Sequence, residues 1–74
     1  MEAFMSNVNE YLVRVKNIRI GEKKIDQTHD DEFTPDLHKL ANTKIVVRKV
    51  YPFWYESTNY FFHADWIEVL KKNI

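Results

Sequence analysis

The stretch KIVVRKVYPFWYESTNYFFH, residues 44–63, decides the fold class. Its first eight residues are rich in β-branched side chains, which favour an extended backbone. These side chains are Ile45, Val46, Val47 and Val50. Apolar side chains occur on both faces of this predicted strand, as is typical of a strand that is buried or bent across a barrel. Pro52 has no amide hydrogen to give to a neighbouring strand, so we predict a strand over residues 44–51 that ends there.

A hairpin is predicted directly after this strand. Residues 53–56 and 60–63 are extended and aromatic, and Ser57-Thr58-Asn59 between them forms the turn, because asparagine tolerates the left-handed conformation that turns require. Eight of the eleven aromatic residues of the chain lie within residues 51–66. A domain this small cannot easily bury all of them, and alternation divides them between a core set and an exposed set. We expect Tyr51, Trp54 and Tyr55 to anchor a protein-binding surface.

The segments before residue 44 are less regular. Residues 11–20 alternate as a strand whose phase slips at Asn17, which indicates a bulge or sharp bend. Residues 21–33 are polar and charged, and we interpret them as a long loop that begins at Gly21. Residues 34–42 predict a short helix, with Thr34 as the N-cap and Asn42 at the exit.

The closing residues 65–72 fit two structures. Asp65 and Glu68 have the spacing of a capping box, which favours a helix. Read as a strand, Ile67 and Val69 share one face. Periodicity alone leaves both open.

The order of predicted elements resembles the SH3-like barrel, and the segment ADWIEVL at residues 64–70 looks like the SH3 ending, in which a helical turn leads into a final strand. This resemblance implies a mainly β fold, a small barrel of about five strands with one short helix. It favours the strand at residues 67–70. The SH3 proline-peptide groove is not implied, because the alanine-leucine-tyrosine opening is absent.

A second resemblance is to small uncharacterised bacteriophage proteins. It is carried by residues 33–47, FTPDLHKLANTKIVV, and residues 62–68, FHADWIE. It implies an accessory protein that binds a host protein, for example a defence or transcription factor, and it brings no known activity.

Length and composition limit the class of protein. The chain has 74 residues, 45% apolar, with no cysteine, and this fits one domain in a reducing compartment. We expect a flexible arm at residues 1–9, a single domain at residues 10–74, and a cytoplasmic location. No apolar run is long enough to span a membrane.

The formal net charge of zero comes from blocks that cancel. Acidic residues gather in the predicted loop, where we expect Asp26, Asp30, Asp31 and Glu32 to provide charge complementarity to a protein partner. The basic residues lie mainly on the two predicted strands. If these strands are neighbours, one basic face could bind nucleic acid, with nearby aromatic rings stacking on bases. Its residues would be Arg14, Lys16, Arg19, Lys44, Arg48 and Lys49.

No catalytic constellation stands out. The only serines, Ser6 and Ser57, lie in the predicted arm and turn, and one glycine cannot build a phosphate loop. His29 lies near three acids, but the spacing matches no standard metal motif. We therefore predict no enzyme activity, no metal and no cofactor. The leading hypothesis is a protein-binding module, with nucleic-acid binding as the alternative and a homodimer as a further use of the aromatic patch.

Overall fold

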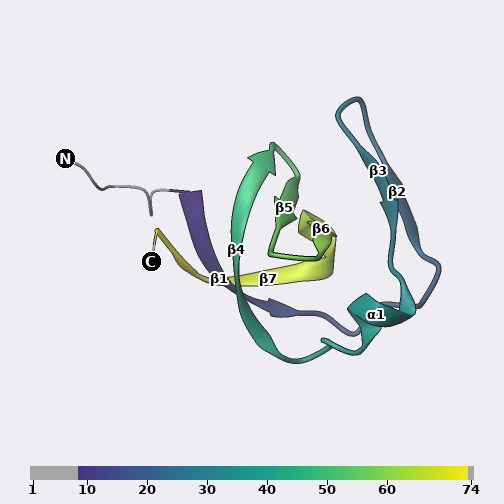
Figure 1. Ribbon diagram of the computed structural model, residues 1–74, viewed down its shortest axis with the longest axis horizontal. Helices are drawn as coiled ribbons and strands as arrows, with labels where there is room; N and C mark the ends of the chain where they lie inside the picture. The colour runs from purple at the N-terminus through teal and green to yellow at the C-terminus, as the bar shows by residue number, and fades with distance from the viewer. Residues whose placement is uncertain (1–8, 74) are drawn as a thin grey trace.

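The computed structural model describes residues 9–73 and shows a mainly β domain (Figure 1). Within these residues, seven strands form two sheets. The strands are β1 Glu10–Val15, β2 Lys23–Ile25, β3 Asp30–Glu32, β4 Lys44–Tyr51, β5 Trp54–Glu56, β6 Phe61–His63 and β7 Ile67–Lys72. A five-stranded antiparallel sheet has the order β6-β5-β4-β1-β7, and β2 pairs with β3 in a separate hairpin. The predicted mainly β class is confirmed, and the predicted arm at residues 1–9 lies outside the described residues except for Asn9.

The first strand is shorter than the sequence pattern predicted. β1 ends at Val15, whose amide donates to the Thr43 carbonyl, and the next amide, of Lys16, donates to the Trp66 carbonyl at 2.9 Å. These bonds continue the ladders to both neighbours of β1, and the strand ends before the phase slip at Asn17. A register shift does occur, but it lies between Leu12 and Val13 in the pairing with β7.

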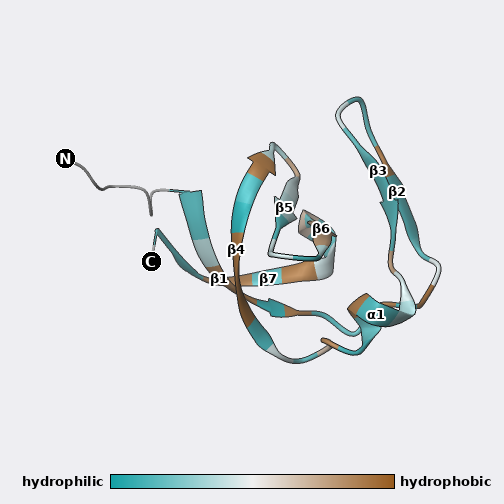
Figure 2. Ribbon diagram, viewed as in Figure 1, coloured by the Kyte–Doolittle hydropathy of each residue, from teal (hydrophilic) through white to brown (hydrophobic). Residues whose placement is uncertain are grey.

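The predicted long loop is wrong in part, because residues 23–32 form the β2–β3 hairpin. Its base is closed by two backbone bonds, from the Gly21 amide to the Phe33 carbonyl and from the Phe33 amide to the Glu22 carbonyl. Gly21 has a φ of 95°, a conformation that glycine adopts without a steric cost. The sequence shows no alternation of apolar and polar residues here, because both strands consist mainly of charged residues. Figure 2 shows that the hairpin is largely hydrophilic.

The predicted short helix is present as one turn, α1, Pro35–His38. The Thr34 hydroxyl accepts a hydrogen bond from the Leu37 amide, so Thr34 is the N-cap that the sequence indicated. Asn42 has a φ of 68° and turns the chain into β4. The helix presents Leu37 to the core, and this packing stabilises an element that is too short to form alone.

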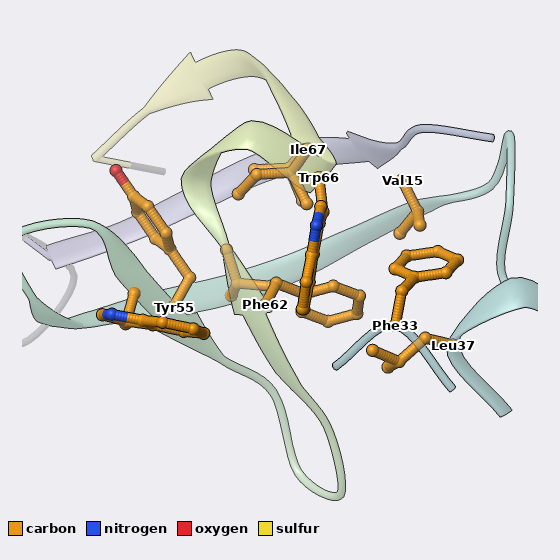
Figure 3. Packing of buried hydrophobic residues seen from close by; sticks show 10 residues of the cluster. Val15, Phe33, Leu37, Tyr55, Phe62, Trp66 and Ile67 are labelled. Atoms are coloured by element: carbon orange, nitrogen blue, oxygen red, sulfur yellow. The ribbon is translucent and has the colours of Figure 1, made fainter. Parts of the chain in front are cut away.

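The core lies between the large sheet and α1. Val13, Val15, Phe33, Val47, Phe62 and Trp66 are almost completely buried. Figure 3 shows the Phe33 ring between Val15 and Leu37, with Trp66 beside Phe62. Phe33 therefore ties the end of the β2–β3 hairpin into the core, since it follows β3 directly.

The predicted hairpin is confirmed, and the closing segment, for which the sequence left helix and strand open, is a strand as the SH3 resemblance favoured. β5 and β6 form the predicted hairpin around residues 57–60, with a backbone bond from the Ser57 amide to the Tyr60 carbonyl. Residues 64–66 form a single 3-10 turn, and Ile67 begins the strand β7, which pairs with β1. Of residues 9–73, none belongs to a helix that is long and apolar enough to cross a membrane.

Candidate functional site: the β4–β5 turn and the β2–β3 hairpin

Two of the three predicted anchors are core residues. Trp54 is completely buried and Tyr55 is 8% exposed, so the prediction that they form an exposed patch is wrong. Neighbouring residues on a strand normally face opposite sides, and here both sides are covered. The β2–β3 hairpin contributes Asp26 and His29 to one side, against Trp54. On the other side, the Tyr11 ring meets Tyr55 edge-on at 5.3 Å, and burial raises the pKa of Tyr55.

Asp26 joins the hairpin to β5. One carboxylate oxygen accepts hydrogen bonds from the hydroxyl and the amide of Thr28 and from the amide of His29, which closes the turn. The other oxygen accepts a bond from the indole Nε1 of Trp54 at 2.9 Å. The bonds from Thr28, with those from Trp54 and His29, lower the pKa of Asp26 to about 2. Asp26 is thus a structural residue of the hairpin, and its oxygens are already used.

His29 adds a second connection between the hairpin and the large sheet. Its ring lies 4.2 Å from the ring of Phe61 and 4.8 Å from that of Trp54, measured between centroids. It also stacks over Tyr51 at 6.4 Å. The Nε2 atom is buried, and its nearest charged group is Asp31 at 3.5 Å. Tyr51 therefore rests on a layer of packed rings.

The exposed aromatic residues lie at the β4–β5 turn. Tyr51 is 42% exposed and Phe53 is 58% exposed, on either side of Pro52. Phe53 stacks on the His63 ring, with 6.3 Å between centroids. Pro52 and Phe53 line one side of a shallow hollow of about 260 Å³, and residues 26–28 of the hairpin line the other. We call Tyr51, Pro52 and Phe53 the turn surface.

Phe53 was missed by the sequence reasoning. It lies two residues before Tyr55, and strict alternation would place both side chains on the same face, which is buried at Tyr55. The available signal was its position directly after Pro52, where a strand cannot continue and a side chain is free to face solvent. Of the predicted anchors, only Tyr51 is exposed.

The predicted acidic residues are divided by the hairpin geometry. Asp30 is exposed and lies opposite Ile25, whereas Asp31 lies opposite Lys24 on the half-buried face. Glu32 is exposed and lies opposite Lys23. Because successive residues of a strand face opposite sides, these acids do not form one charged face beside Tyr51.

The predicted basic face is also divided. β1 and β4 are neighbours as the nucleic-acid hypothesis required, and Arg14 lies opposite Lys44. Arg14 is paired with Glu68 at 3.3 Å, however, and Arg48 lies between Glu10 and Glu56 in the register.

The other three basic residues lie outside the pairing of Arg14, Lys44 and Arg48. Lys49 follows Arg48 on the opposite side of the strand, where its Nζ lies 6.0 Å from the centre of the Tyr55 ring. Lys16 and Arg19 lie after β1. The six residues therefore do not all lie on one face: Arg14, Lys44 and Arg48 share a side of the sheet, and Lys49 lies on the other.

A polar network supports the turn surface from below. His63 is largely buried, and its Nδ1 accepts a hydrogen bond from the Asp65 amide at 3.0 Å. Burial lowers the pKa of His63, and the nearby carboxylate of Asp65 opposes this effect. Lys24 reaches Asp65 at 3.1 Å, and this contact lowers the pKa of Asp65. Together these contacts connect the hairpin to the 3-10 turn below Phe53.

The described residues show no metal centre. Among residues 9–73, no three or more His, Asp or Glu side chains are grouped so that they could hold a metal ion. Comparison of the chain with protein-family models, curated proteins and solved structures finds no match.

Proposed function

We propose that the protein is a non-enzymatic binding module that docks on another protein through the turn surface. The observation that carries this proposal is the exposure of Tyr51 and Phe53 on a rigid support. Large exposed aromatic groups are frequent anchors of protein interfaces, because they bury much apolar area and lose little conformational entropy. The turn surface lies beside a hollow that could receive a partner side chain.

The support is rigid because each exposed ring rests on a fixed neighbour. Tyr51 stacks on His29, and Phe53 stacks on His63. Both histidines in turn pack against the buried ring of Trp54, at 4.8 and 4.9 Å. A surface that is already ordered loses less entropy when it binds, so more of the contact energy becomes affinity.

The class of partner follows from the resemblances in the sequence. We propose an SH3-like fold, a cytoplasmic location suited to a cysteine-free chain, and a bacteriophage accessory role in which a host protein is bound and its activity altered. Nucleic-acid binding is less well supported, since the cations that would contact phosphate are divided between faces or lie beside acids.

The test is quantitative capture of proteins from a bacterial lysate by the immobilised chain. We expect Tyr51→Ala/Phe53→Ala to lose the proteins that the wild type retains. Ile25→Ala is the matched control, because Ile25 is 67% exposed and lies on the hairpin, outside the turn surface. If the double variant retains the same proteins as the wild type, the turn surface is not the docking site.

A further inference from the structure

The strand β7 forms one edge of the large sheet. Among residues 9–73, β7 pairs with β1 alone, so its other edge presents backbone amides and carbonyls that no described strand uses. Two apolar side chains lie in the middle of this strand, Val69 at 40% exposed and Leu70 at 37% exposed. An edge strand with exposed apolar side chains is a template on which a further strand can pair.

The backbone of β7 offers hydrogen-bonding groups near both of its ends. The carbonyl of Trp66 accepts a hydrogen bond from the amide that follows β1, and the amide of Asn73 donates one to the first residue of β1. The backbone groups of these two residues therefore point towards β1. Because such groups alternate in direction along a strand, those of Ile67 and Lys72 point to the free edge.

The register of β7 places an acidic and a basic side chain on the same face. Glu68 lies opposite Arg14, and Lys71 lies opposite Leu12. Arg14 and Leu12 are two positions apart on β1, so they and their partners share one side of the sheet. Residues three positions apart would face opposite sides in a regular strand, and the register shift in β7 is what brings Glu68 and Lys71 together.

We propose that the free edge of β7 binds a second copy of this chain, with the two β7 strands antiparallel about a twofold axis. The segment Glu68-Val69-Leu70-Lys71 is complementary to itself in this arrangement. Glu68 of each copy lies opposite Lys71 of the other, which gives two cross-strand ion pairs. The apolar side chains of the two copies pack between these pairs.

The same register also joins the two backbones. When Glu68 lies opposite Lys71, Ile67 of one copy lies opposite Lys72 of the other, and these are the positions whose backbone groups face the free edge. The Glu68 carboxylate lies 3.3 Å from Arg14, but its side chain is 56% exposed, so it can accept a second cation. The two five-stranded sheets then become one continuous sheet.

The charges of β7 favour an identical strand over other strands. Lysines on an edge strand commonly prevent pairing with other chains, because the added strand would bury or crowd their charge. In the proposed pairing, Lys71 meets a carboxylate that only a strand with the matching sequence supplies at that position. The proposal is independent of the turn surface, which lies at the β4–β5 turn.

Sedimentation equilibrium over a concentration series up to about 1 mM tests this proposal. We expect a monomer–dimer equilibrium for the wild type. Glu68→Lys or Lys71→Glu alone should weaken the dimer about tenfold, because each change creates two like-charged pairs across the twofold axis. Glu68→Lys/Lys71→Glu exchanges the charges and should restore the dimer. An equimolar mixture of the two single variants should also dimerise, since their strands then carry opposite charges.

The matched controls are Asp30→Lys and Lys39→Glu, which change the net charge by the same amounts at exposed positions outside β7. They should change the dissociation constant less than twofold, and circular dichroism confirms that each variant is folded. A wild-type chain that stays monomeric at the highest concentration, or a dimer that both single reversals leave unchanged, would overturn the proposal. Equal weakening by the controls would do so too.

Tyr51→Ala/Phe53→Ala separates this proposal from the turn surface. We expect this variant to dimerise as the wild type does, because neither residue belongs to β7. Loss of the dimer in this variant would place the second copy on the turn surface and overturn the pairing of β7. A monomeric wild type, in contrast, leaves the turn surface free to bind a different protein.

Discussion

The indole Nε1 of Trp54 donates a hydrogen bond to Oδ2 of Asp26 at 2.9 Å, across 28 positions of the chain. This bond explains why the most aromatic part of the sequence is not its most exposed part. It brings the β2–β3 hairpin over β5, and the hairpin then covers Trp54 and carries His29 beneath Tyr51. The exposed aromatic surface is thereby confined to the β4–β5 turn.

Asp26→Asn tests the electrostatic part of this connection. The pKa of Asp26 is about 2 in the folded chain and about 3.8 in the unfolded chain, where it has its ordinary value. Between these values the unfolded chain binds more protons, so the contribution of Asp26 to stability is complete above about pH 4 and is lost as the pH falls towards 2. Urea unfolding from pH 7 to pH 2 should show a steeper acid loss for the wild type than for the variant. Parallel curves would contradict the assignment.

His63→Asn tests the support beneath Phe53. Burial lowers the pKa of His63 below 6.5, and its Nδ1 already accepts a hydrogen bond, so protonation is disfavoured in the folded chain. The contribution of neutral His63 is therefore present above pH 6.5 and is lost as the pH falls through the lower, folded pKa. An asparagine can accept the same bond and does not titrate. We expect the free energy of unfolding to fall less between pH 7 and pH 5 in the variant, and an unchanged slope would exclude this role.

Asn42→Ala and Asn42→Gly test the turn before β4. Asn42 has a φ of 68°, which alanine tolerates poorly and glycine tolerates well. Asn42→Ala should reduce the free energy of unfolding by about 1 kcal/mol, and Asn42→Gly should change it by less than about 0.5 kcal/mol. Chemical denaturation of the two variants measures both values. Equal destabilisation by alanine and glycine would mean that the asparagine side chain, and not the backbone conformation, is what matters.

The elements whose structure is determined by residues close to them in the sequence could be predicted. The strand at residues 44–51 was predicted with its exact ends because β-branched residues and Pro52 act locally, and the Thr34 cap is also a local signal. The β2–β3 hairpin could not be predicted, because its strands carry charges in place of an alternating apolar pattern.

The site depended on contacts between distant residues. Alternation divides Trp54 and Tyr55 between two faces but does not reveal that both faces are covered. Trp54 is covered by Asp26 and His29, which lie far away in the chain. No sequence pattern within residues 51–63 indicates these contacts. Tyr51 was predicted as one of the aromatic residues concentrated in residues 51–66. The position of Pro52 between Tyr51 and Phe53 is the local signal that would have completed the turn surface.

Site-specific photo-crosslinking tests the central claim most directly. Phe53 is replaced by p-benzoylphenylalanine, which keeps an aromatic group at this 58% exposed position, and the chain is irradiated in a bacterial lysate. The control carries the same group at Ile25. We predict a discrete covalent adduct from position 53 that is absent from position 25 and that disappears when Tyr51→Ala is added. Adducts of equal yield and identity from both positions, or none from position 53, would contradict a partner that docks on the turn surface.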